Sequence, residues 1–252
     1  MIDLNADLGE GFGVWRLGDD TALLDLVTSA NVACGFHAGD PLTIRATCEA
    51  AVARGVAIGA QVSYRDLAGF GRREMDVPPR ELRAEILYQL AAVDGIARTV
   101  GGRVSYVKPH GALYNRAVHD VEQAEALLQA VAEYPASAPL PVLTLSNSVI
   151  HDIAARYGTP TIIEFFADRA YTPYGTLASR REAGSVLHDP AEVAARAVRM
   201  ATHGTVLTTT GSELQLAARS FCVHGDTPNA VALAQAVRTA LTDAGTTIGR
   251  FA

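Results

Sequence analysis

The regular alternation of short apolar runs with longer amphipathic segments is the feature that most constrains the fold. Strand-like runs are predicted at residues 2–5, 31–34, 56–61, 103–107, 141–145, 161–165, 205–207 and 220–223. Helical segments separate most of these runs, and repeated strand–helix units favour a mainly parallel sheet with helices outside. A chain of 252 residues with seven or eight such units has the size of a (β/α) barrel. The alternative is a doubly wound open sheet, which has the same periodicity.

Local signals mark where several helices begin and end. An Asp or Thr followed by Pro predicts a helix start, because the side chain caps the first turn and Pro needs no hydrogen-bonded amide there. Such pairs are Asp40-Pro41, Asp189-Pro190 and Thr227-Pro228. Glycines that suit a left-handed helix end are Gly55, Gly204 and Gly245. Residues 78–101 predict a long helix with one apolar face, and residues 63–75, SYRDLAGFGRREM, predict a long functional loop.

Composition excludes several classes of protein. Hydrophobic residues make up 49% of the chain and charged residues 19%, which is typical of a packed core and not of a disordered chain. The 21 Lys and Arg against 27 Asp and Glu leave a formal charge of -6 without a basic cluster, which disfavours nucleic-acid and membrane-surface binding. The three cysteines form no CxxC pair, and the N-terminus does not read as a signal peptide. We expect one (β/α)-barrel domain over residues 1–252, located in the cytoplasm.

Three of the seven histidines follow strand-like runs and lie near glycines. They are His37, His110 and His224, whereas solvated or capping positions are expected for His119, His151, His188 and His203. The carboxyl ends of parallel strands share one rim, where such folds build their sites. A lone histidine is more often structural than catalytic, but three in equivalent positions predict one shared site.

The N-terminal run DLNADLGEG adds carboxylates to the same rim. Asp3, Asn5 and Asp7 share one face of an extended strand, and apolar residues occupy the other. A polar face directed into a barrel is costly unless it lines a site. Asp7 and Glu10 are therefore candidate general bases or metal ligands. The alternative is a charged, half-exposed edge strand.

A second polar group begins at the end of a later predicted strand. Glu164 and Asp168 are expected to orient or deprotonate a substrate, and Arg169 to clamp a carboxylate or phosphate. The alternative for Asp168 is an internal ion pair with Arg169 or Arg180. Lys108 is a further candidate, as an electrophile or phosphate partner.

Several familiar signatures are missing from the chain. It has no G-x-x-x-x-G-K-[ST] loop, no G-x-G-x-x-G and no G-x-S-x-G elbow. The remaining rim of carboxylates and histidines points to hydrolytic or metal-assisted chemistry on a polar small molecule.

Five segments together resemble the LamB/YcsF family. They are 3–10 (DLNADLGE), 29–40 (SANVACGFHAGD), 107–115 (VKPHGALYN), 166–171 (FADRAY) and 222–226 (CVHGD). The resemblance implies a seven-stranded (β/α) barrel of the glycoside hydrolase/deacetylase type. It also implies cleavage of the lactam 5-oxo-L-proline to L-glutamate, coupled to ATP hydrolysis and dependent on 5-oxoprolinase subunits B and C. Phosphorylation of the carbonyl oxygen would turn a resonance-stabilised amide into a good electrophile.

The residues that match family motif positions are Asp7, His37, Lys108, His110, Asp168, Arg169, His224 and Asp226. The roles that follow are our hypothesis, and Asn5, Glu10 and Gln61 enter it from the residue pattern alone. Expected catalytic residues are Asp7, His37, His110 and Asp168. Expected substrate contacts are Asn5, Glu10, Gln61, Lys108, Arg169, His224 and Asp226. Asp7, His37 and His110 would activate the attacking water or hold a divalent metal, if one is bound. The ATP site is expected to lie on the partner subunits or to be shared with them.

One position departs from the family pattern. Many members have Gly-Ala-His-Pro after the third strand, where this chain has Gly59-Ala60-Gln61-Val62. Glutamine cannot shuttle protons or ligate a metal as imidazole does. We therefore expect Gln61 to position substrate, or the chain to belong to a branch with altered specificity.

Two other functions remain open from the sequence. A stand-alone metal-dependent deacetylase or amidohydrolase would contain metal and work without ATP or partners. A non-catalytic lactam-binding subunit would bind its ligand without Asp7 or His110.

Overall fold

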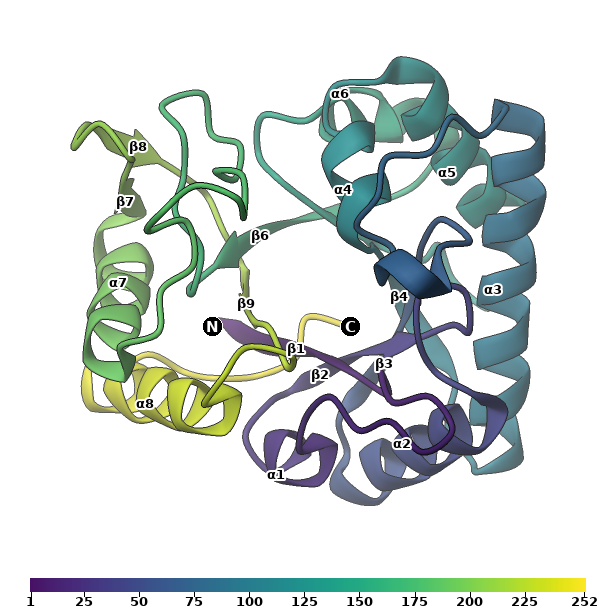
Figure 1. Cartoon of the computed structure of the whole chain (residues 1–252), viewed down its shortest axis with the longest axis horizontal. Coiled ribbons are helices and arrows are strands. Elements are labelled where there is room, and N and C mark those ends of the chain that lie inside the picture. Colours follow the sequence, from purple (N-terminus) through teal and green to yellow (C-terminus); the bar gives the residue numbers. More distant parts are fainter.

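The computed structural model describes all residues, 1–252, and its centre is a closed barrel of seven parallel strands (Figure 1). In pairing order, the strands are β1 (Asp3–Leu8), β2 (Ser29–Ala33), β3 (Ala57–Val62), β4 (Val104–Pro109), β5 (Val142–Thr144), β6 (Thr161–Phe166) and β9 (Ser220–Val223). Strand β9 pairs with both β6 and β1 and so closes the sheet. The predicted seven-stranded barrel is confirmed, and the open-sheet alternative is excluded.

Helices surround the barrel and cover its outer face (Figure 1). They are α1 (Asp20–Leu24), α2 (Pro41–Arg54), α3 (Pro79–Thr99), α4 (Gly111–Ala117), α5 (Val121–Glu133), α6 (Val149–Ile153), α7 (Pro190–His203) and α8 (Ala230–Asp243), with 3-10 turns η1 (Leu67–Gly69) and η2 (Ala154–Tyr157). The long helix predicted at 78–101 is confirmed as α3, in which Leu82, Ile86 and Leu90 are buried on one face. None of the helices combines the length and apolar character that a membrane span requires.

Two of the three predicted helix starts are confirmed. The side chains of Asp40 and Asp189 accept hydrogen bonds from first-turn amides of α2 and α7, and Pro follows each of them. Both helices end at a left-handed glycine, Gly55 and Gly204, as predicted. The signal at Gly245 lies one residue beyond the helix cap, since α8 ends at Asp243.

The helix start predicted at Thr227-Pro228 is wrong. Helix α8 begins only at Ala230, after Asn229 in a left-handed conformation with φ 63°. The hydroxyl of Thr227 donates instead to the carboxylate of Asp168, 3.2 Å away. The oxygen that would have capped the helix is therefore used at the rim of the barrel.

The run predicted at 205–207 forms a strand outside the barrel. Strand β7 (Thr205–Leu207) pairs antiparallel with β8 (Glu213–Gln215) in a separate hairpin. An isolated bridge joins Thr208, directly after β7, to Tyr171 in the loop that follows β6. The hairpin therefore braces this loop, and the chain returns to the barrel only at β9.

The interior of the barrel is polar along β1. Asp3, Asn5 and Asp7 are buried and alternate with apolar residues that are equally buried. Ser29 and Ser220, from the two neighbouring strands, donate to Asp3. Because β1 is paired on both sides, the half-exposed edge strand is excluded and the inward polar face is confirmed.

A chain of hydrogen bonds crosses the interior toward the rim. Tyr106 lies over Gly59, where an added Cβ would be 2.2 Å from the ring. Its hydroxyl donates to Asn31 Oδ1 at 2.7 Å, and Asn31 Nδ2 donates to Asp7 Oδ1 at 2.9 Å. The absence of a side chain at Gly59 thus leaves space for Tyr106, the first residue of the hydrogen-bond chain that ends at Asp7.

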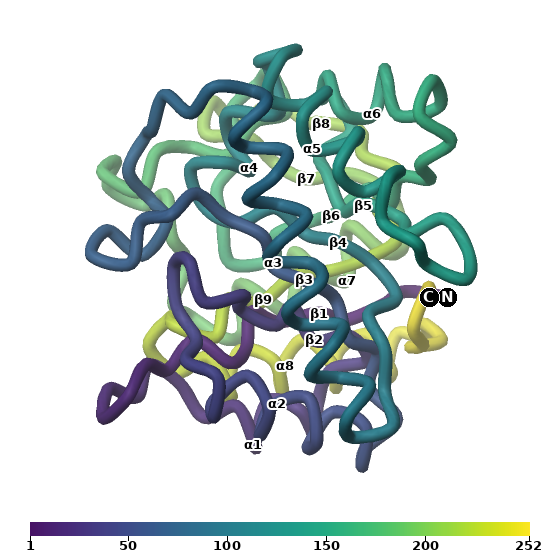
Figure 2. The backbone as a smooth tube through the Cα atoms, turned by 90° about the vertical axis from the view of Figure 1, so that its right-hand side faces the viewer, coloured from purple at the N-terminus to yellow at the C-terminus, as the bar shows by residue number.

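The two ends of the barrel differ. The termini lie together at one end (Figure 2), where Ile2 and Ile248 form a bridge. The loops that follow the parallel strands lie at the opposite end (Figure 2), and that end holds the candidate site.

Candidate active site

The strands carry the predicted histidines to one rim. His37 follows β2, His110 follows β4 and His224 follows β9, and each is at most 6% exposed. The exposed histidines are, as predicted, His119, His151, His188 and His203. Spacing relative to strands therefore separates the two groups correctly.

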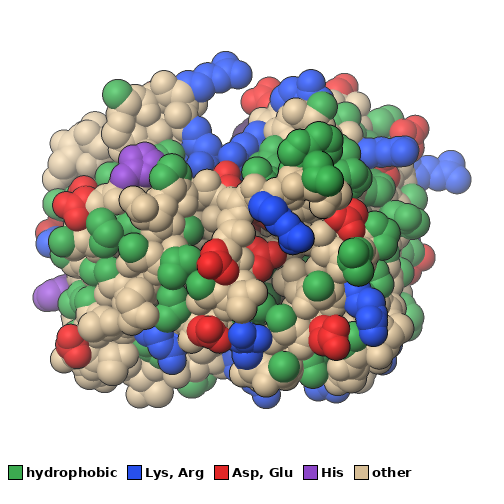
Figure 3. Space-filling view, turned by 60° about the horizontal axis from the view of Figure 1, so that its bottom comes forward, with side chains coloured by type: hydrophobic (Ala, Val, Ile, Leu, Met, Phe, Trp, Pro, Cys, Tyr) green, Lys and Arg blue, Asp and Glu red, His purple; other side chains and the backbone are tan.

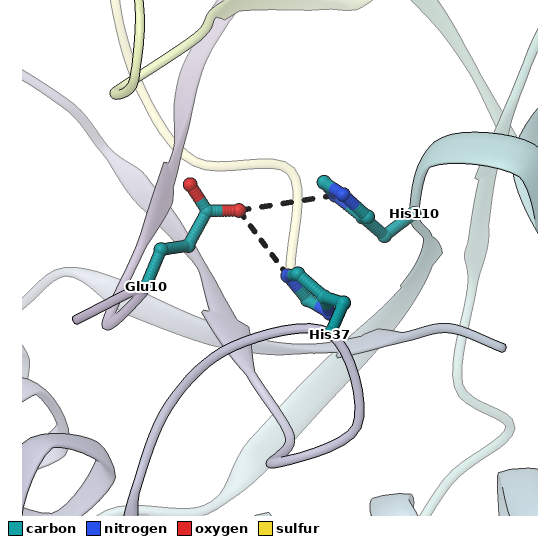
Figure 4. A group of neighbouring side chains, drawn as sticks. All are labelled: Glu10, His37 and His110. Atoms are coloured by element: carbon teal, nitrogen blue, oxygen red, sulfur yellow. Dashed lines mark hydrogen bonds and ion pairs between the residues drawn. The ribbon is translucent and has the colours of Figure 1, made fainter. Parts of the chain in front are cut away.

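His37 and His110 form a cluster with Glu10 (Figure 4). The two imidazole rings stack with centroids 3.8 Å apart, and Glu10 Oε1 lies 3.2 Å from His37 Nε2 and 3.8 Å from His110 Nδ1. Burial lowers the pKa of His37 to about 4. Burial and the adjacent His37 hold the pKa of His110 well below its usual value, so both rings are neutral at pH 7. Burial and the charge of Asp7 raise the pKa of Glu10.

The predicted functional loop, residues 63–75, forms one wall of this cluster. Ser63 Oγ lies 3.0 Å from His37 Nδ1, and His110 Nε2 donates to the Phe70 carbonyl at 3.0 Å. The Phe70 ring meets both imidazoles edge-on, at 5.5 and 5.3 Å between centroids. The loop therefore orients both histidines.

Asp7 lies at the end of β1 beside a buried ammonium. Lys108 Nζ is 3.1 Å from Asp7 Oδ1 and 2.8 Å from Glu164 Oε1, and it also contacts Asn5 Oδ1 and Cys222 Sγ. Burial alone would raise the pKa of Asp7, but Lys108, then His224 and His110, hold it below its usual range. Asp7 is therefore ionised at pH 7.

Lys108 does not reach the rim. Its side chain is 3% exposed, and its donors are taken by partners inside the barrel. Despite burial, the charges of Asp7 and Glu164 raise the pKa of Lys108. The structure thus places Lys108 and Asn5 below the site, where they support Asp7; direct substrate contact is not favoured.

His224 forms a second cluster with Asp168. Its Nδ1 lies 2.9 Å from both carboxylate oxygens of Asp168, and Phe166 stacks on the imidazole at 5.4 Å between centroids. Burial would raise the pKa of Asp168, but His224 holds it below its usual value. The ionised carboxylate accepts the Nδ1–H, which leaves Nε2 of the imidazole free.

Arg169 and Asp226 form no hydrogen bond or ion pair with either cluster. The Arg169 guanidinium donates to the carbonyl oxygens of Ser185 and Ala178, so it anchors the loop after β6 and would have to give up those bonds to clamp a substrate. Asp226 pairs with Arg72 at 2.8 Å. The internal ion pair considered for Asp168 is formed with neither arginine.

Sequence reasoning misses several residues of the site. They are Asn31, Ser63, Arg72, Arg180 and Thr227. Ser63 and Arg72 lie in the loop predicted to be functional, and the pattern at Thr227 predicts a helix cap instead. Asn31 has a usable signal, because it belongs to a predicted strand and falls on an inward position.

All three cysteines are buried and free. Burial raises the pKa of each thiol, to about 12 for Cys48. They are inert packing residues, apart from the contact of Cys222 with Lys108.

A model of the LamB/YcsF family matches residues 2–252 of this barrel. The chain belongs to the LamB/YcsF family. The 5-oxoprolinase A subunit of Streptomyces avermitilis is 58% identical over 252 residues, covering all of both chains. That of Mycolicibacterium gilvum is 57% identical over 250 residues, 99% of this chain and 98% of the relative. The crystal structure of the lactam utilization protein from Thermus thermophilus superposes with a TM-score of 0.93 at 42% identity, covering 99% of each chain.

Gln61 is the residue at which the chain departs from the expected Gly-Ala-His-Pro pattern. It is fully buried, and its Nε2 donates to His110 Nδ1 at 3.0 Å. Its Oε1 is buried without a hydrogen-bond partner. The glutamine thus contacts the His110 side of the cluster, where its amide supports one imidazole.

Two hollows of this LamB/YcsF barrel border the clusters. One of about 380 Å³ lies over Asp7 and Glu10 and is rimmed by Arg16, Asp19 and Asp20. A second hollow, of about 320 Å³, is lined by Arg180, Asp226 and Thr227 among others. Arg180 forms no ion pair within the chain, although most of its surface is buried. The first hollow has four carboxylates and one arginine among its lining residues, and Arg180 is the one arginine of the second, beside Glu182 and Asp226.

Proposed function

We propose that this chain is the lactam-binding and ring-opening subunit of a 5-oxoprolinase that converts 5-oxo-L-proline to L-glutamate with subunits B and C, coupled to ATP hydrolysis. The observation that carries the proposal is the pair of histidine clusters on one rim. Histidines of both clusters, His110 and His224, help to keep Asp7 ionised. The full-length relatives, each named as the 5-oxoprolinase A subunit, support it.

Hydrolysis of a lactam needs an activated water and a proton for the leaving nitrogen. The Glu10, His37 and His110 cluster suits the first task, because two neutral imidazoles direct lone pairs into one small space. A water held there attacks the ring carbonyl carbon and gives its proton to the cluster.

His224 suits the second task. Asp168 holds its Nδ1–H, so the opposite nitrogen, Nε2, can carry and deliver a proton. As the C–N bond breaks, that proton goes to the ring nitrogen, which becomes the amine of glutamate. Thr227 and Phe166 fix the orientation of this acid.

The substrate carboxylate needs a cation that is not already paired. Arg180 meets this requirement, since it lines the hollow beside Asp226 and Thr227 and has no internal partner. Arg72 is committed to Asp226. We assign carboxylate recognition to Arg180, which replaces Arg169 in that role.

The hollow over Asp7 does not fit a triphosphate. The hollow over Asp7 presents Glu10, Asp19 and Asp20 against Arg16 alone, and four carboxylates repel phosphate. On the face drawn in Figure 3, acidic and basic side chains are interspersed, and neither sign dominates. We therefore place ATP on the partner subunits and derive no step of this chain through it.

The test is glutamate release from 5-oxoproline by the chain alone and with subunits B and C, each with and without ATP. We expect release only from the complete complex with ATP. Release by the chain alone without ATP would indicate a stand-alone amidohydrolase. Turnover by the complex that survives His110→Ala would indicate a non-catalytic binding subunit.

A further inference from the structure

We propose that Glu10, His37 and His110 bind one divalent cation of the zinc class, through Glu10 Oε1, His37 Nε2 and His110 Nδ1. One ligand atom from each residue lies within 4.8 Å of the others, and all three residues are buried. Figure 4 shows one carboxylate oxygen directed at both rings. Of the two carboxylates predicted from the sequence as candidate ligands, Asp7 and Glu10, the proposal selects Glu10.

The first argument is the tautomer of His37. Ser63 Oγ donates its only hydrogen to the carbonyl of Tyr64 at 3.0 Å, so toward His37 it can only accept. The imidazole hydrogen of neutral His37 is therefore on Nδ1. Its Nε2 carries a lone pair, which faces Glu10 at 3.2 Å.

The second argument is the tautomer of His110. Its Nε2 lies 3.0 Å from the Phe70 carbonyl, which is an acceptor only, so the imidazole hydrogen is on Nε2. The lone pair of Nδ1 then faces Gln61 Nε2 and, at 3.8 Å, Glu10 Oε1. An imidazole whose far nitrogen donates to a carbonyl has the usual arrangement of a metal ligand.

Three acceptors therefore converge with no donor between Glu10 and His37. Two lone pairs and a carboxylate oxygen repel one another unless a positive charge lies between them. A proton on Glu10 would relieve the contact with His37 only, and the Gln61 amide satisfies His110 Nδ1 only. One metal ion that displaces the Gln61 amide from Nδ1 relieves all three contacts. Asp7 is a poorer ligand, because its Oδ1 is paired with Lys108 and its Oδ2 is 4.0 Å from His110.

The backbone around the cluster supports this arrangement independently. Phe70 adopts a left-handed φ of 55°, rare for an aromatic residue, and so directs its carbonyl at His110. Gly71 follows with φ 66°, and a Cβ there would lie 2.8 Å from His37 Cβ and 2.9 Å from His110 Cδ2. The loop is shaped to hold both imidazoles in these orientations.

The ligand set decides the class of cation. Two imidazole nitrogens and one carboxylate suit Zn²⁺, Co²⁺ or Fe²⁺, whereas Mg²⁺ and Ca²⁺ prefer oxygen ligands only. Three protein ligands leave a position for water, whose pKa such a cation lowers. That consequence rests on the proposed function, whereas binding itself does not.

The experiment measures binding without substrate or partners. The untagged chain is stripped with a chelator and titrated with Co²⁺ and, separately, with Mg²⁺, and visible absorption and calorimetry follow the titrations. We expect one Co²⁺ per chain with the spectrum of nitrogen and oxygen ligands, and no comparable Mg²⁺ binding. Glu10→Gln and His37→Gln should weaken Co²⁺ binding at least about 100-fold, and Ser63→Ala about 10- to 100-fold.

His224→Gln is the matched control, because it removes a buried histidine from the same rim that is not a proposed ligand. It should bind Co²⁺ like the unaltered chain. Circular dichroism identifies any variant that fails to fold. If a ligand variant does not fold, the Co²⁺ affinity of Ser63→Ala tests the proposal instead. The inference is overturned if the chain binds no Co²⁺, or if Glu10→Gln and Ser63→Ala bind it unchanged. Cobalt binding by a chain whose complex releases no glutamate would contradict the proposed function alone.

Discussion

His37 and His110 face the carboxylate of Glu10 with their lone pairs, whereas His224 faces the carboxylate of Asp168 with an N–H. Both clusters lie at the carboxyl ends of strands and both are buried. In the second, the carboxylate and the imidazole satisfy each other. In the first, the outer nitrogens are held by Ser63 and Phe70. The inner nitrogen of His37 faces only Glu10, and that of His110 also accepts from Gln61 Nε2.

The difference teaches that contact between histidine and carboxylate does not define a role. The hydrogen on the imidazole decides it, and that hydrogen is set by the partner on the far side of the ring. The first cluster is arranged to receive a cation, a water or a proton. The second is arranged to hold one proton and pass it on.

The largest expected effect comes from removing a member of the first cluster. His110→Ala should lower turnover of the reconstituted complex by about 10³- to 10⁴-fold, because the water loses its acceptor. Glutamate release with ATP measures this loss. The exposed His203→Ala should keep full turnover; a comparable loss there would show that the effect is not specific to the rim.

Removal of the proton donor should cost less. We expect His224→Gln to lower kcat by about 10²-fold, because the leaving nitrogen loses its proton donor. Adding Asp168→Asn to His224→Gln should lower kcat little further, since the two residues act as one unit. Fully additive losses would show that the second cluster is not a unit.

The loop that positions the first cluster can be altered without substituting a histidine. Gly71→Ala places a methyl group against both imidazoles and should lower turnover about 10- to 100-fold. Gly211→Ala is the control, because it has a similar φ of 79° with open space around it. Equal losses in the two variants would mean that backbone strain, and not displacement of the imidazoles, is responsible.

Substrate recognition should respond separately from chemistry. Arg180→Ala should raise KM for 5-oxoproline about tenfold or more, while kcat changes less. This is the loss of binding expected when one charge-assisted hydrogen bond is removed. Steady-state kinetics of the complex measure both constants. A KM unaltered by Arg180→Ala, or raised equally by Arg169→Ala, would contradict the assignment.

The smallest expected effect is on the free energy of unfolding. It depends on the different environments of two carboxylates on β1, Asp3 and Asp7. Burial raises the pKa of Asp3 despite hydrogen bonds from Ser220, Ser29 and Thr28, whereas Lys108 holds that of Asp7 low. The folded state therefore binds the Asp3 proton more tightly than the unfolded chain. The stability from this proton is present below about pH 3.9 and is lost as pH rises through the folded pKa.

Asp3→Asn does not titrate, so the free energy of unfolding of the unaltered chain should fall relative to it as pH rises above about 4. Urea denaturation of both chains at several pH values measures this difference. A difference that is constant, or of opposite sign, would show that Asp3 is already ionised in the folded barrel at low pH.

Much of the fold was predictable because its signals are local. Alternation of apolar runs with helical segments indicated the barrel, and proline after aspartate marked α2 and α7. The error at Thr227 has the same origin, since a hydroxyl before proline caps a helix only if no stronger partner is near. Asp168, 59 residues away along the chain, is that partner.

The sequence by itself determined the barrel, the family and the rim on which the polar residues gather. Those follow from periodicity and from short segments, which depend on neighbours in the chain. Only the tertiary structure decided that Glu10 joins the two stacked histidines, that Lys108 and Arg169 are used internally, and that Arg180 is unpaired. The reason is physical: the role of a buried charge or imidazole is set by partners from distant strands, and no spacing along the chain specifies where their hydrogens and lone pairs point.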